Sequence, residues 1–397
     1  MNSTFIRFQH VLLILFFFIS SLIQVSAQYP SDSAKISLLT LSPGSETYSA
    51  FGHSAIHVAD KRRGIDFVYN YGTFDFATPN FYPKFIFGHL MYFLSISDFR
   101  DFFLSYKRWG QAMWEQELNL TNKEKWQLVQ NLQTNYQEEN RYYRYGFFRD
   151  NCSTRIRDII EKSVDGKVIY DANYIKNPES FRNLVAPYFE HRDLWTLFGL
   201  DLLFGKGNDN TAELRDYMFL PDNLMNLFAT AKITGNNVLR NLSQKPVELF
   251  PTTLIFPEPN PLTKPTNILW FVFAMVCIFS FLEYKKTKNG KWLDVILFGI
   301  IGLLGLLFAA LMIGTLHKEL LNNYNIIWAN PVNIIFCIGL FFRSKPLWLK
   351  ILMKAYGILL IIFIPASFLL TQVIPAAAYP LMAILLVRII KIIYTKR

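Results

Sequence analysis

Cysteine is scarce in this chain, with three in 397 residues. Two of them, Cys277 and Cys337, lie inside strongly apolar runs, where a thiol behaves as a small hydrophobic side chain. A disulfide framework is therefore excluded as the main support of the fold. The remaining cysteine, Cys152, has no disulfide partner in the soluble part of the chain, so this lone thiol needs another reason to be there.

Acidic residues are nearly missing from the last third of the sequence. Residues 28–265 contain almost equal numbers of acidic and basic side chains, so the net charge of +10 belongs to residues 266–397. Basic side chains that flank apolar runs indicate a membrane and argue against a nucleic-acid partner. The sequence also lacks internal repeats and low-complexity tracts.

The first 27 residues resemble an export signal. Arg7 gives a short basic start, residues 11–19 are apolar, and Val25, Ser26 and Ala27 form a small-residue cleavage site. The sequence predicts a signal peptide over residues 1–27 and a mature chain that begins near Gln28. An uncleaved anchor is the alternative, and it would leave the following domain on the same side of the membrane.

Hydropathy predicts five membrane spans. They are Ile268–Leu282, Leu293–Thr315, Pro331–Phe342, Leu347–Leu370 and Val373–Ile393. Basic and nearly uncharged connections alternate between these spans. The positive-inside rule then places the N-terminal domain in the periplasm and the C-terminus in the cytoplasm, as expected for a multi-pass protein of the cell inner membrane.

A proline-rich stretch over residues 251–265 separates the two parts and predicts an extended linker. The predicted domains are residues 28–250 and residues 266–397. Within the first, residues 36–41, 55–59 and 66–70 have the pattern of strands. Thr121 and Glu124 form a capping box before a predicted helix that runs toward Gln137. Strands come early and helices late, so the expected class is α+β.

Cys152 stands where a helix is predicted to begin. Asp150 and Asn151 are favourable N-cap residues, and Ile156, Ile159 and later apolar residues recur at helical spacing. The unpaired N–H groups and the positive end of the helix dipole stabilise a thiolate at this position. The sequence therefore predicts that Cys152 is a nucleophile.

A base for that thiol is found in the alternating segment from Phe51 to Val58. This pattern predicts a strand that presents His53 and His57 on one face, so His53 could take the thiol proton. Asn151 could donate to the oxyanion beside the N–H of Cys152, or could only cap the helix. A residue that orients His53 is expected from triad logic, and four side chains are open for that role: His57, Tyr48, Asn70 and Tyr71.

Less specific interpretations remain open for the same residues. A lone cysteine is often a buried core residue, and a strand histidine is often only hydrogen-bonded. His53 and His57 have a zinc-like spacing only on a helix, which the alternation disfavours, so we expect no metal and no cofactor.

Several motifs together resemble a known family across nearly the whole chain. Matching segments occur around Ser42, Gly52–Ile56, Tyr69–Phe74, Glu139–Arg141 and Asn151–Arg155, and in the membrane part from His317 to Pro331. They are similar to the Lnb-type lipoprotein N-acyltransferases of Bacteroidota and, more distantly, to permuted NlpC/P60-like thiol enzymes. Since the His strand precedes the Cys helix, a permuted papain-like domain is expected.

This resemblance implies an acyl transfer from a phospholipid donor, through Cys152 paired with His53, to the α-amino group of a diacylated lipoprotein. Arg155 and Arg149 flank the thiol and could meet a lipid phosphate, or could form pairs within the protein. His317 lies at a predicted membrane surface, where a lipid headgroup or a simple anchoring role would suit it.

Two rival functions use the same sequence features. A periplasmic cell-wall cysteine peptidase or amidase would need an open polar groove but not five membrane spans. A noncatalytic membrane sensor or scaffold would have a buried and replaceable Cys152.

Overall fold

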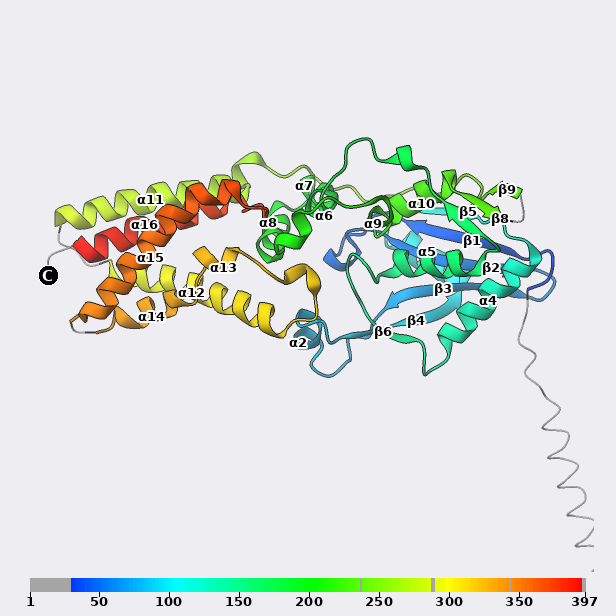
Figure 1. Cartoon of the computed structure of the whole chain (residues 1–397), viewed down its shortest axis with the longest axis horizontal. Helices are drawn as coiled ribbons and strands as arrows, with labels where there is room; N and C mark the ends of the chain where they lie inside the picture. The colour runs from blue at the N-terminus through cyan, green and yellow to red at the C-terminus, as the bar shows by residue number, and fades with distance from the viewer. Residues whose placement is uncertain (1–29, 236–237, 287–289, 343, 395–397) are drawn as a thin grey trace, which may run out of the picture.

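The computed structural model describes residues 30–235, 238–286, 290–342 and 344–394. The predicted signal peptide over residues 1–27 lies outside the described residues. A mixed α/β domain occupies one end of the elongated molecule and a bundle of helices occupies the other (Figure 1).

A seven-stranded antiparallel sheet organises the N-terminal domain, in the order β10-β5-β1-β2-β3-β4-β6. Its strands are β1 (Lys35–Leu41), β2 (His53–Asp60), β3 (Ile65–Thr73), β4 (Met91–Asp98), β5 (Met113–Glu117), β6 (Tyr142–Arg144) and β10 (Val247–Phe250). A small second sheet contains β7 (Lys167–Ile169), β8 (Lys232–Gly235) and β9 (Val238–Asn241). The three predicted strands are confirmed within a few residues, and helices do come late in the domain, but four short strands, β7 to β10, come late as well. Strands as short as β7 to β10 give too few residues for an alternating pattern.

Helices cover both faces of the main sheet. The helices of this domain are α2 (Phe81–Ile86), α3 (Phe99–Arg108), α4 (Asn122–Tyr136), α5 (Cys152–Ser163), α6 (Phe181–Val185), α7 (Pro187–Glu190), α8 (Leu194–Leu203), α9 (Leu214–Tyr217) and α10 (Pro221–Thr230), with short 3₁₀ turns at η1 (Thr47–Ser49), η2 (Ala172–Tyr174) and η3 (Lys206–Asp209). Ile56 and Val58 face a core shared with α4, α5 and α10, while Ala55 faces a second core closed by Phe102 of α3. The strand alternation read from the sequence therefore sorts β2 correctly between two layers.

Helix α4 begins as predicted. Thr121 and Glu124 form a reciprocal capping box, and the buried Glu124 carboxylate also accepts hydrogen bonds from the guanidinium of Arg240. Arg240 lies on β9, so the pair fastens the second sheet to the start of α4.

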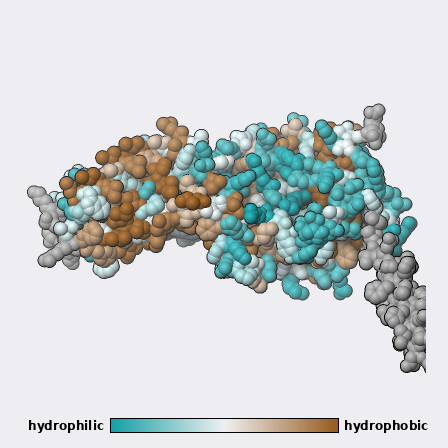
Figure 2. Space-filling model, turned by 60° about the horizontal axis from the view of Figure 1, so that its bottom comes forward, coloured by the Kyte–Doolittle hydropathy of each residue, from teal (hydrophilic) through white to brown (hydrophobic). Residues whose placement is uncertain are grey.

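The C-terminal bundle is apolar on its outer surface (Figure 2). It contains α11 (Pro265–Lys286), α12 (Lys291–Gly314), α13 (Asn325–Trp328), α14 (Val332–Gly339), α15 (Leu347–Ala366) and α16 (Ala378–Tyr394), with 3₁₀ turns η4 (Pro261–Thr263), η5 (Lys318–Leu320) and η6 (Ser367–Leu369). Among the described helices, three are long and apolar enough to cross a membrane: Pro265–Lys285, Lys291–Gly314 and Leu347–Leu369. Because α14 and α16 are shorter than the predicted spans, the count of five stays a prediction.

Buried charges join three helices of the bundle. Arg388 of α16 is fully buried and donates to Asp294 of α12 at 2.5 Å and to Glu283 of α11 at 2.6 Å. A buried charge is tolerated only when it is paired, so these contacts fix how the three helices pack.

The two parts of the molecule meet at two places. On one side, α8 packs into the bundle, and its Leu202 shares a core with α12, α15 and α16. On the other, the end of α12 adjoins α2 (Figure 1), where Leu316 N–H donates to the Phe87 carbonyl at 2.9 Å. These contacts therefore fix the position of the N-terminal domain relative to the bundle.

Candidate active site

Cys152 is the first residue of α5, as predicted. Asn151 caps the helix: its Oδ1 accepts from the Thr154 N–H at 2.9 Å, and the Thr154 hydroxyl accepts in return from the Asn151 N–H. Its Nδ2 donates to the carbonyls of Phe147 and Phe219 at 2.9 and 2.8 Å. With both ends of its amide engaged within the protein, Asn151 has the contacts of a structural cap.

His53, the first residue of β2, lies beside the thiol of Cys152. Gly52 precedes it with φ +76, and a Cβ at that position would collide with the Leu41 carbonyl, so only glycine permits this turn. The hydroxyls of Ser54 and Ser153 lie 2.9 Å apart and fasten β2 to α5.

Asn70 of β3 makes the hydrogen bond that triad logic asks for. The Nε2–H of His53 donates to the Asn70 Oδ1 at 2.5 Å, which leaves Nδ1 to accept a proton. The nearby Gly72 lies close to both side chains: a Cβ there would lie 3.6 Å from the Cys152 Cβ and 4.0 Å from the His53 Cε1. Three elements thus deliver Cys152, His53 and Asn70 to one point.

The surroundings of Cys152 favour its thiolate. Burial alone would raise the pKa of the thiol, but the His53 imidazole, the Ser54 N–H and the Ser153 hydroxyl outweigh burial and lower it to about 7. Burial works against the charged form of His53, yet Cys152 and Asn70 raise its pKa above the ordinary value. The pair can therefore hold a thiolate and an imidazolium near neutral pH.

Two tyrosines border this pair, and neither was singled out from the sequence. Burial first, and then the charge of Cys152, raise the pKa of Tyr145 well above its ordinary value. A Cβ on Gly72 would lie 3.5 Å from the Tyr145 ring and 3.6 Å from the Cys152 Cβ, so this ring lies close to Cys152. Tyr106 of α3 stacks on the His53 ring with centroids 6.4 Å apart. Tyr145 therefore keeps a protonated hydroxyl near Cys152 and can act as a donor.

The other residues considered for orienting His53 lie in different surroundings. His57 bonds to Glu115 and Asp66, each at 2.8 Å, and these carboxylates raise its pKa against the effect of burial. The Tyr71 hydroxyl accepts from Asn135 of α4 at 2.8 Å. Tyr48 is 64% exposed and packs on aromatic rings.

The predicted headgroup residues also have partners within the protein. Arg155 forms two hydrogen bonds with Asp150, at 2.5 and 3.0 Å, and its guanidinium lies 3.5 Å from the Tyr143 ring centre. Arg149 is exposed and approaches Asp216. His317 Nε2 donates to the Phe85 carbonyl at 2.9 Å, so it ties the bundle to α2. The geometry thus favours the alternative of intraprotein contacts for Arg155 and a joining role for His317.

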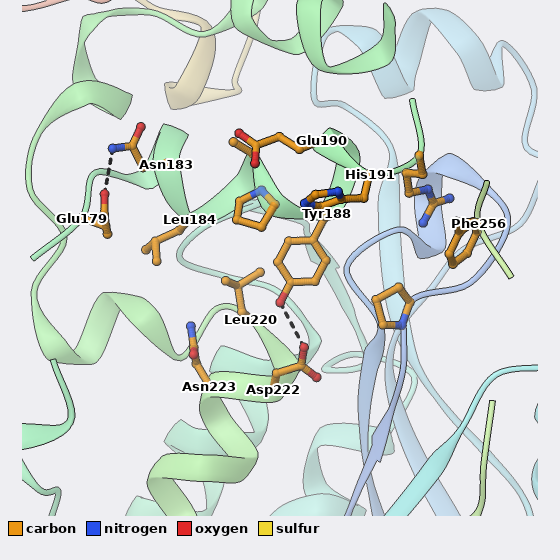
Figure 3. Close-up of a pocket in the computed structure, with 14 residues that line it drawn as sticks. Glu179, Asn183, Leu184, Tyr188, Glu190, His191, Leu220, Asp222, Asn223 and Phe256 are labelled. Atoms are coloured by element: carbon orange, nitrogen blue, oxygen red, sulfur yellow. Dashed lines mark hydrogen bonds between the residues drawn. The ribbon is translucent and has the colours of Figure 1, made fainter. Parts of the chain in front are cut away.

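A pocket of about 910 Å³ lies elsewhere, near α7 and the start of α10 (Figure 3). There the Tyr188 hydroxyl donates to the Asp222 carboxylate at 3.2 Å, and His191 and Phe256 line another side. Its lining residues include neither Cys152 nor His53, so it is separate from the candidate site. In the described part of the chain, no group of three or more His, Cys, Asp or Glu residues could hold a metal ion.

Comparison with known proteins gives two matches to family models. The model of the Lnb N-terminal periplasmic domain matches residues 23–195, and that of the Lnb transmembrane domain matches residues 257–397. No curated protein and no solved structure matches the chain. The first match contains Cys152, His53 and Asn70, and the second contains the apolar bundle. The chain therefore belongs to the Lnb family and is a membrane protein with a periplasmic N-terminal domain.

Proposed function

We propose that this protein is a lipoprotein N-acyltransferase of the inner membrane, which moves an acyl chain from a phospholipid to the α-amino group of a diacylglyceryl-cysteine. The observation that carries the proposal is the group formed by Cys152, His53 and Asn70 at a helix N-terminus. In this chain the group belongs to a domain that is joined to an apolar bundle. Family membership points to the same class of reaction.

In the first step, the Cys152 thiolate attacks an ester carbonyl of the phospholipid. His53 holds the thiol proton as an imidazolium, and Asn70 keeps its ring in place. The new C–S bond forms as the ester C–O bond breaks, and His53 gives the proton to the departing alkoxide of the lysophospholipid. The product on the protein is an acyl thioester of Cys152.

The tetrahedral intermediate places a negative oxygen beside the start of α5. The N–H of Cys152 is one of the helix-terminal donors that have no partner within the helix. The Tyr145 hydroxyl is the second donor, since it stays protonated and lies at the thiol. Asn151 is not assigned this role, because its side-chain amide is already fully used. Its Oδ1 accepts from the Thr154 N–H, and its Nδ2 donates to the carbonyls of Phe147 and Phe219.

In the second step, the lipoprotein amine attacks the thioester carbonyl. His53 takes the amine proton, the C–S bond breaks, and an amide bond forms as the Cys152 thiolate is regenerated. The sum is transfer of one acyl chain, with no metal ion or cofactor needed in either step.

The proposal includes a permuted papain-like domain in the periplasm and a five-span bundle with its C-terminus in the cytoplasm. The order of the His strand and the Cys helix supports the first part. The second rests on the alternating basic connections and on the end of α16, which lies at the end of the bundle away from the sheet (Figure 1).

Mass spectrometry tests this function directly. Purified full-length protein is incubated with a diacylated lipopeptide and phospholipid vesicles, and wild type is compared with Cys152→Ala. A third, amide-linked acyl chain should appear with the wild type only, and phospholipid alone should add a hydroxylamine-sensitive acyl mass to the wild-type protein. If folded wild type acylates neither itself nor the lipopeptide, the proposal is wrong and cell-wall peptides become the substrates to test.

A further inference from the structure

A continuous series of aromatic rings runs between the candidate site and the bundle. We call it the aromatic track, and it consists of Tyr145, Tyr92, Phe74, Phe76, Phe81 and Phe85. Neighbouring rings lie close together: Tyr145 to Tyr92 at 4.5 Å, Tyr92 to Phe74 at 5.3 Å, Phe74 to Phe81 at 5.9 Å and Phe81 to Phe85 at 6.1 Å between centroids. Phe76 packs on both Phe74 and Phe81, each at 4.9 Å.

One end of the aromatic track is at the nucleophile. Tyr145 lies close to Cys152, because a Cβ on Gly72 would lie 3.5 Å from the Tyr145 ring and 3.6 Å from the Cys152 Cβ. The thiol itself is only 6% exposed, so a substrate must approach it along a defined direction.

The other end is at the membrane bundle. The Phe85 carbonyl accepts from His317, and the following Phe87 carbonyl accepts from the Leu316 N–H at the end of α12. Ile313 and Leu316 are exposed there, next to the exposed Phe85 and Ile86 of α2. Apolar surface therefore continues from a helix long enough to cross a membrane onto the N-terminal domain.

The aromatic track lies along the edge of the core: Tyr92 is buried, and Phe74, Phe81 and Tyr145 pack against the core while Phe76 and Phe85 are exposed. Phe76 is 61% exposed and Phe85 is 47% exposed, and the adjacent Tyr82 is 72% exposed. The segment from Phe74 to Phe87 includes only two charged side chains, Asp75 and Lys84. Apolar surface of this kind needs an occupant, and its continuity with the bundle indicates a lipid.

We propose that the aromatic track binds the acyl chain of the donor phospholipid while its ester carbonyl lies at Cys152. The inference rests on the proposed function and adds the place of the donor. The donor fits better than the acceptor because the transferred chain itself is bonded to the carbonyl that Cys152 attacks, so it must extend away from the thiol. The lipoprotein acceptor presents its amine at Cys152, and its own acyl chains are attached farther from the reacting atom.

Photo-crosslinking tests the site without relying on catalysis. Full-length Cys152→Ala protein is placed in phosphatidylethanolamine vesicles that contain a phospholipid with a diazirine near the end of one acyl chain. Adducts should map to residues 74–92 as well as to the bundle. Adducts confined to the bundle would overturn the proposal, as would labelling of residues 74–92 only by a diacyl lipopeptide with the same diazirine.

Kinetics with two donors tests whether the track serves the reaction. Acylation of Cys152 is measured with dioleoyl phosphatidylethanolamine vesicles and with p-nitrophenyl acetate, whose acyl group is too short to reach the track. In the double variant Phe76→Ser and Phe85→Ser, the ratio of the long-chain to the short-chain rate should fall about tenfold, which corresponds to lost burial of roughly two methylene groups.

The matched control changes exposed apolar residues of the second sheet. Ile169 and Leu239 are 52% and 60% exposed on β7 and β9, and their double serine variant should keep the wild-type ratio. An unchanged ratio in the Phe76 and Phe85 variant would overturn the aromatic track. Failure of wild type with both donors would instead overturn the proposed function, so the two failures are distinguishable.

Discussion

At the scale of single residues, the chemistry of Cys152 depends on neighbours that act against its burial. The imidazole of His53, the Ser54 N–H and the Ser153 hydroxyl all favour the thiolate in a place where burial disfavours it. A lone buried cysteine without these groups would be inert. Whether a buried cysteine is a nucleophile or only a core residue thus depends on the groups that surround its sulfur.

The first prediction concerns the pH dependence of that thiol. Because the pKa of Cys152 is lowered to about 7, its thiolate is present above pH 7 and is lost as the pH falls below it. The rate of alkylation by iodoacetamide, followed at the Cys152 peptide by mass spectrometry, should have its midpoint near pH 7. In His53→Ala the midpoint should rise to at least the ordinary thiol value of about 8.5. A wild-type midpoint above that value would contradict the assigned pair.

The second prediction concerns Tyr145. Removing its hydroxyl in Tyr145→Phe takes away a donor but keeps the ring on Tyr92, so thioester formation should slow about 100-fold. Intact-mass measurement of the acylated protein gives this rate. Tyr142→Phe on the exposed end of β6 is the control and should behave as wild type. Equal rates in both variants would leave Tyr145 with a packing role only.

At the scale of elements, the start of α5 is the structure on which the site depends. The Asn151 cap joins α5 to the carbonyls of Phe147 and Phe219, so one side chain fixes the helix start against two other segments. An N-cap contributes about 1 kcal/mol, and each further buried hydrogen bond adds a similar amount.

The third prediction follows from that cap. Asn151→Ala should lower the free energy of unfolding by about 2 kcal/mol, which corresponds to a fall in Tm of several degrees. Asn151→Asp keeps the acceptor for the Thr154 N–H but loses both Nδ2 donors. Its free energy of unfolding should therefore fall only by the contribution of the Nδ2 hydrogen bonds and not by that of the N-cap. Thermal unfolding of the full-length protein in detergent measures both. A wild-type Tm in Asn151→Ala, together with lost activity, would favour the oxyanion role instead.

At the scale of the whole molecule, a buried polar cluster holds the N-terminal domain on the bundle. Gln372 is fully buried, and its Nε2 donates to the Phe204 carbonyl at 3.2 Å and to Asn323 at 3.0 Å. Asn323 in turn donates to the Leu202 carbonyl at the end of α8 at 2.7 Å. The cluster therefore fixes the end of α8 and Phe204 against the bundle.

The fourth prediction tests this coupling. Gln372→Ala leaves polar partners unpaired at the junction but touches no residue of the site, so acylation from vesicles should fall several-fold more than acylation by p-nitrophenyl acetate. The exposed Gln137→Ala serves as the matched control. Equal losses with both donors would mean that the junction supports general stability rather than the approach to lipid.

The fifth prediction concerns topology. With five crossings and a periplasmic N-terminal domain, a reporter fused after Arg397 lies in the cytoplasm. Alkaline phosphatase at that position should be inactive and green fluorescent protein should fluoresce. The opposite pair of results would require an even number of crossings and would exclude one of the two short helices, α14 or α16, as a span.

Features that depend on local patterns could be predicted from the amino-acid sequence. The alternation in β2, the Thr121 capping box and the helix start at Cys152 all rest on contacts within a few residues, and each was predicted correctly. The helical positions of the apolar runs also followed from composition, although the lengths of α14 and α16 did not. Packing also decides which side chains of a helix are buried: Leu128, Val129 and Leu132 of α4 are buried, whereas Trp126 on the same helix is 37% exposed.

Contacts between residues that are distant in the chain depend on the packing of the whole fold. Four residues were open as the partner of His53, and Asn70 makes that bond because β3 pairs with β2 in a register that the sequence does not specify. Tyr145 and the aromatic track were likewise found only in the fold, since rings far apart in the chain pack together when α2, β4 and the segment after β6 converge. Local propensities fix elements, whereas a catalytic site depends on how those elements pack against one another, and packing is a property of the whole chain.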